Sequence, residues 1–446
     1  MKTLYFSIML MTGLALCPLT HSQEGDLPLS KESYTQEELQ EDFIRFREIL
    51  EKEHCCLYEY TSKQEMDSLF DAHFMRISRE MSSTEFFALL ATITARIGCM
   101  HTSTWMPGRF FNTGRENMFP LKIKLIGPYA VVTGSYNASD EIPYGSILLD
   151  INDKPIDLVL DQLRQITPGD ALNPYFKDAQ LTHRFSMFFA SLYGFPERYK
   201  IRFAPPGRKS FEDSILSPAH IDSVRAVVFS HFQSPPLEFE ILEEFNCARM
   251  TISTFVYYDK VDYFRDFMDS CFHLIHDLQV NNLILDLRKN GGGDPYCAAD
   301  LFSYLQPEPS VYFAESYRGY QELASPIPMP AYPFKGNLYT LIDGSCGSTN
   351  GHFCALLKHH RIGKFVGTPS GATYKCNAGR DTEFQLENTG MIVTIGRSTY
   401  AVAVQDMDKS SPIMPDIAVK ENYKIFLEGR DQFIEAALLE IEMDTL

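Results

Sequence analysis

The chain has 446 residues, 45% of them apolar and 22% charged, which is typical of globular proteins and argues against a disordered chain. Its 58 acidic residues outnumber the 40 basic ones, giving a formal charge of −18. Because phosphate binding needs a surplus of Lys and Arg, this balance speaks against nucleic acid and anionic membranes as general partners.

The first residues predict an export signal. Lys2 supplies a positive charge, the stretch from Leu4 to Leu19 is almost wholly apolar or small, and Thr20 and Ser22 suit a cleavage site. The apolar run is shorter than the roughly 20 residues of a spanning helix, so we expect residues 1–22 to be a cleaved signal peptide. Lipid attachment at Cys17 is disfavoured because the preceding Leu16 is large. The mature chain is then expected in the periplasm, on the outer surface or in the medium, without a membrane span.

The cysteines predict neither a disulfide scaffold nor a metal site. Of the 10 cysteines, Cys17 lies in the expected signal, and the odd number that remains cannot all pair internally. No C-x-x-C pair and no zinc spacing occurs. We therefore expect mostly buried free thiols, with one or two bridges at most, and no metal or cofactor.

Residues 30–110 predict a helical region. Residues 33–38 offer capping residues ahead of apolar residues at helical spacing, and residues 82–85 are a capping signal before a second apolar series. The second helix should stop at Gly98.

Residues 118–205 predict a small β-rich domain. Leu121 to Ile126 alternates as a half-buried strand does, and Tyr199 to Phe203 reads as a closing strand. Between them, residues 142–156 resemble the PDZ pattern, in which a Gly turn leads to a strand, an Asn-centred turn and a helix. Residues 206–235 carry several Pro and Ser and predict a linker.

Residues 236–446 predict an α/β domain. An amphipathic helix over residues 262–279 precedes the continuous apolar strand 283–287, which suits a sheet covered on both faces. Residues 337–342 and 362–366 predict further strands, with a helix over 351–359 between them. This alternation favours right-handed crossovers and a parallel sheet.

Two turns of this domain carry groups suited to catalysis. In the first, Gly291, Gly292 and Gly293 follow the apolar strand and lead into a helix over 295–305, so that backbone N–H groups are available to an anion or to an oxyanion. In the second, Ser348 follows a strand and opens a helix, where the helix dipole favours developing negative charge. Taken alone, the glycine turn could be a plain tight loop and Ser348 a plain helix cap. The occurrence of both turns, in this order along the chain, favours a catalytic site.

The sequence from Leu283 to Gly293, followed by Asp343-Gly-x-x-x-Ser348, resembles the C-terminal processing peptidase and tricorn-core serine peptidase family. The resemblance extends over residues 34–440, and Pro412 to Ile417 is similar to a further motif of the family. It implies a crotonase-like α/β peptidase domain with an N-terminal helical segment and an inserted PDZ-like domain. It also implies that Ser348 is the nucleophile and that the N–H groups of Thr349 and Gly292 form the oxyanion hole.

The general base differs between two branches of this family. One branch uses a Lys about 25 positions after the Ser, where this chain has Thr373, with Lys375 two residues further on. The other uses a His in an Asp-Gly-His-Thr block, and Cys99-Met100-His101-Thr102 fits that block except at its first two positions. We therefore favour His101, with Lys375 as the alternative. A His base needs an orienting acid, and Asp406 and Asp408 are the candidates, between which the sequence does not decide.

The leading hypothesis is an exported serine endopeptidase acting on proteins or peptides, in which backbone groups at Tyr144, Gly145 and Ser146 bind a peptide's C-terminal carboxylate. A second hypothesis is a catalytically inactive binder on the same fold, motivated by the departures from the family pattern at residues 99–100, Thr373, Lys409 and Pro412. A hydrolase of non-peptide acyl bonds is the third. The oligomeric state is left open.

Overall fold

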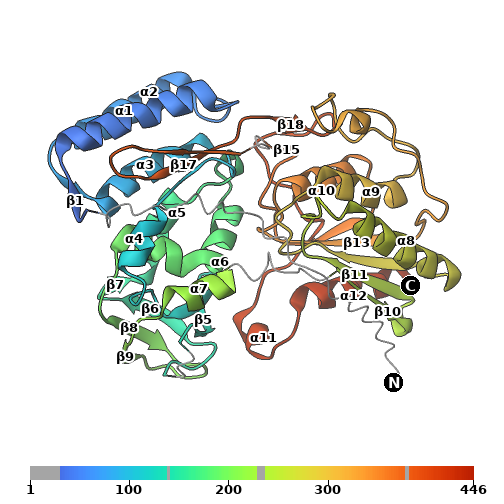
Figure 1. The fold of residues 1–446 in the computed structure, drawn as a ribbon. Helices are drawn as coiled ribbons and strands as arrows, with labels where there is room; N and C mark the ends of the chain where they lie inside the picture. Colours follow the sequence, from blue (N-terminus) through green and yellow to red (C-terminus); the bar gives the residue numbers. More distant parts are fainter. Residues whose placement is uncertain (1–30, 138–140, 229–236, 377–380, 446) are drawn as a thin grey trace. The chain divides into compact units, whose positions relative to one another are not determined.

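The computed structural model describes residues 31–137, 141–228, 237–376 and 381–445, which form two compact units (Figure 1). The C-terminal unit comprises the described residues 237–376 and 399–445. The N-terminal unit comprises residues 31–137, 141–228 and 381–398, so it includes a segment from late in the sequence. The expected signal peptide, residues 1–22, lies outside the described residues.

A six-stranded sheet forms the centre of the C-terminal unit. Its strands follow one another in space in the same order as in the sequence: β10 (Leu237–Leu242), β11 (Cys247–Ile252), β12 (Asn282–Asp286), β13 (Asn337–Ile342), β14 (Lys364–Gly367) and β19 (Ile417–Ala418). The strands from β11 to β19 are parallel, and β10 is antiparallel at the edge. The predicted parallel α/β architecture is confirmed for this unit, including the buried strand expected at 283–287.

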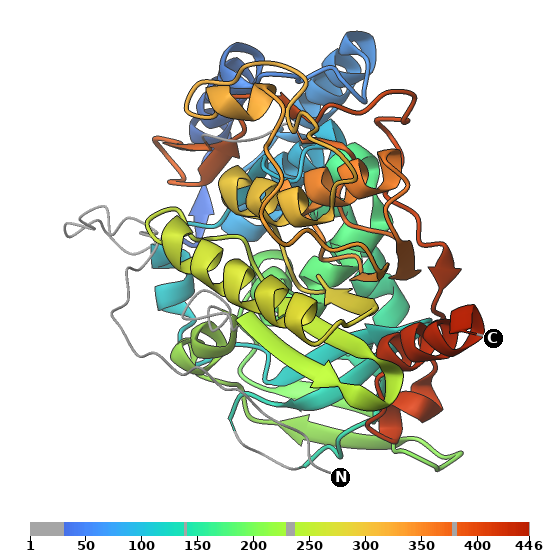
Figure 2. The ribbon, with the colours of Figure 1, turned by 90° about the vertical axis from the view of Figure 1, so that its right-hand side faces the viewer.

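Helices cover both faces of this sheet because its central strands carry apolar side chains on both sides. Leu283 and Leu285 pack in one cluster with α8 (Val261–Asp277), α9 (Pro295–Leu305) and α10 (Thr349–His359). Ile284 and Leu341 face the opposite side and pack with α12 (Gln432–Thr445). Both α8 and α12 can be followed in Figure 2. The unit also contains η4 (Gln321–Ala324), β15 (Lys375–Cys376), β18 (Tyr400–Ala401), α11 (Tyr423–Leu427) and, before β11, η3 (Glu243–Phe245).

Three capped helices begin the N-terminal unit. They are α1 (Gln36–Glu53), α2 (Lys63–Arg76) and α3 (Ser83–Ile97), with the short strands β1 (Ser33–Tyr34) and β2 (Met81–Ser82) paired beside them. Each helix starts with a capping box, at Thr35, Ser62 and Ser82 respectively. The capping signals expected within residues 33–38 and 82–85 are therefore confirmed. Helix α3 ends at Gly98, whose φ of 75° gives the left-handed C-cap that favours glycine.

An antiparallel sheet and the helices that follow or precede its strands complete much of this unit. Its strands are β4 (Leu121–Ile126), β5 (Tyr129–Ser135), β6 (Ile147–Ile151), β8 (Tyr199–Ala204) and β9 (Glu212–Leu216), with β7 (Lys154–Pro155) paired to β6. The helices are α4 (Gly108–Thr113), α5 (Ile156–Ile166), η1 (Asp170–Leu172), α6 (Pro174–Tyr193) and α7 (Ile221–Val228). Residues 206–228, expected to begin a linker, contain β9 and α7, because β9 pairs with β8 over its whole length. The Pro and Ser residues there mark turns.

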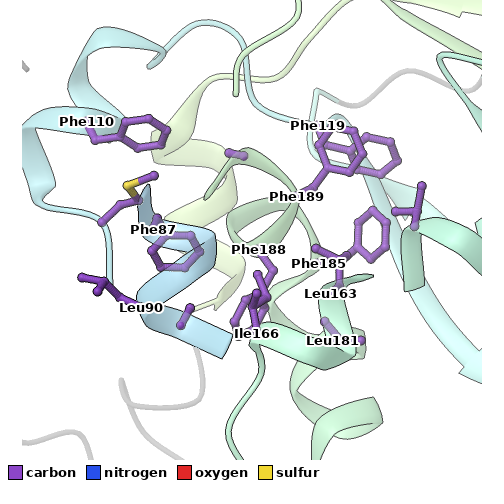
Figure 3. Packing of buried hydrophobic residues seen from close by; sticks show 14 of the residues in the cluster. Phe87, Leu90, Phe110, Phe119, Leu163, Ile166, Leu181, Phe185, Phe188 and Phe189 are labelled. Atoms are coloured by element: carbon purple, nitrogen blue, oxygen red, sulfur yellow. The ribbon is translucent and has the colours of Figure 1, made fainter. Parts of the chain in front are cut away.

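Aromatic residues fill the core of the N-terminal unit (Figure 3). Phe119 packs against Phe185 and Phe189, with ring centroids 5.1 and 5.3 Å apart, so α6 is fixed onto the sheet next to β4. The same cluster includes Leu90 of α3 and Leu163 of α5. Phe185, Phe188 and Phe189 of α6 are all buried in this core.

A three-stranded sheet joins the late segment to the N-terminal unit. Strand β17 (Ile392–Ile395) pairs on one side with β16 (Thr382–Gln385) and on the other with β3 (Ser103–Trp105), both antiparallel. The hairpin of β16 and β17 thereby lies beside the chain that follows α3. None of the helices in the described ranges is long and apolar enough to cross a membrane.

Candidate active site

The first component of the site is the glycine turn, residues 287–294, which follows strand β12. Asn290 is fully buried, and its side-chain Nδ2 donates to the carbonyl of Ile252 at 3.0 Å. Its Oδ1 accepts the N–H of Gly292 at 2.9 Å. Asp294 caps α9 by accepting the N–H of Tyr296. The turn is therefore held by these side chains and by a backbone bridge in which Phe255 bonds to Gly292 and Asp294.

The second component is the serine turn, residues 343–348, which follows strand β13. Ser348 has φ 50° and ψ −126°, a conformation that costs a residue with a side chain of order 1–3 kcal/mol. It occupies the N-cap position of α10, yet its side chain makes no capping hydrogen bond. The alternative of a plain helix cap is thus not supported. A strained serine between a strand and a helix is the arrangement that exposes a nucleophile.

Buried hydrogen bonds connect the two turns. The Gly347 N–H donates to the carbonyl of Asn290 at 3.2 Å, and the Asn350 side chain donates to the same carbonyl at 3.0 Å. The Thr349 hydroxyl donates to the carbonyl of Gly293 at 2.6 Å. Asn350, like Asn290, has no exposed surface. These bonds fix Ser348 against the glycines, as a preorganised catalytic site requires.

Gly292 approaches the serine so closely that a side chain is excluded. A Cβ on Gly292 would lie 2.8 Å from the Ser348 Cβ and 2.9 Å from the Thr349 nitrogen, and the φ of Gly292 is +102°. Ser348, Thr349 and Gly292, which the sequence analysis grouped, are therefore brought together. The N–H of Gly292 is used by Asn290 in this structure. To donate to an oxyanion, the Gly292 N–H would first have to break its hydrogen bond to the Asn290 side chain.

Neighbouring groups limit the choice of nucleophile and base. Cys346 is buried two residues before Ser348, and burial raises the pKa of its thiol far above the ordinary value, so it stays an unreactive thiol. Thr373, at the place of the Lys in the other branch, is fully buried, and its hydroxyl donates to the carbonyl of Lys375. Lys375 itself starts β15, which pairs with β18.

His101 lies in the N-terminal unit, in the short loop between α3 and β3. Its Nδ1 is 3.0 Å from Oδ2 of Asp381. Because a carboxylate only accepts, Nδ1 is the protonated nitrogen in this contact. The loop is held by Asp170, a buried residue whose carboxylate accepts the Met100 N–H at 3.0 Å. An acid from a distant segment thus supports the loop that departs from the Asp-Gly-His-Thr pattern.

Asp381 was not anticipated from the sequence. It stands 280 residues after His101, immediately before a short strand, and no local motif marks it. Asn290 and Asn350 were not anticipated either. Their position within the two turns could have pointed to them, since buried amides commonly satisfy the carbonyls of irregular turns.

The two acids expected from the sequence lie on the loop after β18. Asp406 is exposed and has a φ of 59°. Asp408 is exposed and accepts hydrogen bonds from the Ser411 hydroxyl and the Ser410 N–H. These bonds, the Ser411 one first, hold the pKa of Asp408 below its ordinary value. The carboxylate of Asp408 is therefore engaged within its own loop.

The residues expected to bind a peptide carboxylate form a turn before β6. The Gly145 N–H donates to the carbonyl of Val132 and the Ser146 N–H to that of Pro143, at 2.8 and 3.1 Å. Two of the expected donors are thus used inside the module, while the Tyr144 side chain is exposed. Among the described residues, no three His, Cys, Asp or Glu side chains gather where they could hold a metal ion.

Comparison with known proteins agrees with this geometry. Residues 246–419 match the family model of peptidase family S41. The solved structure of mature CPAF is similar, with 13% identity, a TM-score of 0.61 and coverage of 91% of this chain and 98% of that chain. Mature CPAF complexed with lactacystin gives 12% identity and a TM-score of 0.62, with 91% and 99% covered. At such identities these two likenesses show the fold alone.

No protein with a curated description matches the chain. The family match covers the glycine turn, the serine turn and the loop with Asp406 and Asp408. The match over residues 246–419, together with the two turns, identifies this part of the chain as a serine-type peptidase domain similar to peptidase family S41.

Proposed function

We propose that the chain is an exported serine endopeptidase in which Ser348 is the nucleophile and His101 the general base. The observation that carries the proposal is the strained backbone of Ser348 at the start of α10, with its side chain not used as a cap and with Gly292 and the Thr349 nitrogen beside it. His101 rests on the resemblance of residues 99–102 to the family block and on its contact with Asp381. Export rests on the sequence of residues 1–22.

The chemistry follows from these groups. His101 accepts the proton of the Ser348 hydroxyl as its oxygen attacks the carbonyl carbon of a peptide bond. The Thr349 N–H, at the N-terminus of α10, stabilises the oxyanion of the tetrahedral intermediate, an effect typically worth about 3 kcal/mol for each donor. Protonated His101 then gives its proton to the leaving amine, and water hydrolyses the acyl-enzyme by the same steps in reverse.

The test is digestion of an unfolded protein, casein, by the wild type and by the Ser348→Ala, His101→Ala and Lys375→Ala variants. We expect cleavage by the wild type and by Lys375→Ala, and none by the other two. Loss with Lys375→Ala but not with His101→Ala would assign the base to Lys375. If the folded wild type cleaves esters but neither casein nor shorter peptides, the substrate is a non-peptide acyl group.

The β4–β9 sheet is proposed to bind the C-terminal end of the substrate, as its resemblance to a PDZ domain implies. The exposed Tyr144 side chain, at the turn before β6, is the group available there. Fluorescence polarisation of labelled peptides with a free or an amidated C-terminus tests this role. Equal affinity for both, or no change in Tyr144→Ala, would contradict it.

A further inference from the structure

His101 and Asp381 meet because of the register of a three-stranded sheet. Ser103 of β3 lies opposite Thr394 of β17, and Thr394 lies opposite Glu383 of β16. Since β17 is antiparallel to both neighbours, β3 and β16 run in the same direction. His101 and Asp381 each stand two residues before the strand residue that flanks Thr394, so they emerge at the same end of the sheet. Their contact is a consequence of strand pairing.

The hairpin that carries Asp381 is fixed at its turn. The Asp42 carboxylate of α1, which is 2% exposed, accepts the N–H groups of Asn388 and Thr389 at 3.0 and 2.8 Å and the Thr389 hydroxyl at 2.7 Å. Arg109 donates to the carbonyl of Thr389 at 2.8 Å. The β16–β17 hairpin is therefore attached to two helices of the N-terminal unit.

The end of the hairpin next to His101 is fixed as well. The Gly396 N–H donates to the Thr102 hydroxyl, and the Gly396 carbonyl accepts the Cys55 N–H, both at 3.3 Å. Arg397 forms an ion pair with Glu53 at 2.7 Å. With its turn and the end of β17 held, the hairpin presents the Asp381 carboxylate to His101 from an attached frame, which a supporting group in a catalytic site needs.

We propose that Asp381 is the positioning residue of His101, a role that rests on the proposed function of His101 as the base. A carboxylate at Nδ1 keeps the proton on that nitrogen, which leaves Nε2 as the acceptor for the serine proton. It also stabilises the imidazolium once the proton has arrived. The Asp381 side chain is 42% exposed and that of His101 23%, so solvent shares in this effect. We therefore expect a loss of about 10- to 100-fold on removing the carboxylate, less than for a fully buried triad acid.

The experiment compares five variants of the full chain: Asp381→Asn, Asp381→Glu, Asp71→Asn, Asp408→Asn and Ser348→Ala. Asp71→Asn is the matched control, because it makes the same change at an exposed aspartate of α2 in the same unit. Asp408→Asn tests one of the two acids that the sequence analysis offered for this role. Two rates are measured: casein cleavage, resolved into kcat and KM, and labelling of Ser348 by a fluorophosphonate. Thermal unfolding of each variant is recorded alongside.

We expect Asp381→Asn to lower kcat and the labelling rate about 10- to 100-fold, with KM, final labelling and unfolding temperature unchanged. Asp381→Glu should recover part of the rate, since the site is open enough for a longer carboxylate. Asp71→Asn should label and cleave at the wild-type rate, and Asp408→Asn should lose less activity than Asp381→Asn. A purely structural role for Asp381 would instead lower the unfolding temperature and the final extent of labelling.

Two results overturn the proposal in different ways. Wild-type rates in Asp381→Asn together with a strong loss in Asp408→Asn would assign the positioning role to the other loop and leave the proposed function standing. A folded wild type that neither cleaves casein nor reacts with the fluorophosphonate would overturn the proposed function, and the role of Asp381 with it.

Discussion

Gly292 lies against Ser348 so tightly that a Cβ on the glycine would be 2.8 Å from the Cβ of the serine. No rotation of a side chain relieves this contact, because the other neighbours are the Gly347 carbonyl oxygen and the Thr349 nitrogen. The glycine and serine turns therefore pack as one unit, and the space between them does not admit a methyl group on Gly292.

Replacement of Gly292 by Ala should abolish activity. The added methyl group meets backbone atoms beside the proposed oxyanion position, and the φ of +102° adds strain. We expect a loss of at least about 100-fold in casein cleavage and of about 1–3 kcal/mol in the free energy of unfolding. Gly291→Ala is the matched control, since a Cβ on Gly291 meets nothing within 4 Å. Equal activity of the two variants would contradict this assignment of the oxyanion site.

Because its backbone is strained, Ser348 should lower the stability of the C-terminal unit while being required for activity. Glycine adopts φ 50° and ψ −126° without the cost that a side chain brings. Both Ser348→Gly and Ser348→Ala should be inactive. We expect Ser348→Gly to exceed Ser348→Ala in stability of the C-terminal unit by about 1 kcal/mol, measured by urea unfolding. If Ser348→Ala proves the more stable, the strain assigned to this residue is wrong.

Removal of the Asp42 carboxylate should loosen the β16–β17 hairpin. Asp42→Ala leaves two N–H groups and a hydroxyl without their acceptor in a buried place, which costs about 2–4 kcal/mol of unfolding free energy. Hydrogen exchange should accelerate in residues 381–395. Casein cleavage should fall as well, through the displacement of Asp381.

The control for Asp42 is its neighbour Glu41. Glu41 is exposed and accepts only the Asn388 side chain among the bonds described for it. Glu41→Gln should therefore change stability by less than about 0.5 kcal/mol. Unchanged exchange of the hairpin in Asp42→Ala would show that the Arg109 bond and the strand pairing hold it alone.

The buried His54 side chain should make the folded protein less stable in mild acid. Burial lowers its pKa from 6.5 to about 4, so between these values the unfolded chain binds a proton that the folded chain does not. Stability therefore falls as the pH decreases through this window. His54→Asn removes the titration and retains an acceptor for the Cys56 N–H.

The measurement is urea unfolding of the N-terminal unit at pH 7.5 and pH 5.0. We compare the unfolding free energy of His54→Asn minus that of the wild type at the two pH values. This difference should be about 2 kcal/mol more favourable to the variant at pH 5.0 than at pH 7.5. The value at pH 7.5 serves as the reference, because it includes any loss of packing by the smaller side chain. A difference that is the same at both pH values would contradict the assigned titration.

Local sequence patterns determined several of the helices, strands and turns of this protein. The sequence predicted the capping signals within residues 33–38 and 82–85, the buried strand at 283–287 and the two turns with Gly292 and Ser348. Each depends on residues within a few positions of one another. Side-chain periodicity and turn chemistry act over this range, so a single sequence reveals them.

Tertiary structure alone decided the rest. The contact of His101 with Asp381 depends on two strand pairings and on the attachment of the hairpin by Asp42, and it joins residues 280 positions apart. The buried amides Asn290 and Asn350 acquire their role only when the two turns come together. Long-range register is set by the sum of packing and pairing across the unit, and no short stretch of sequence carries that information.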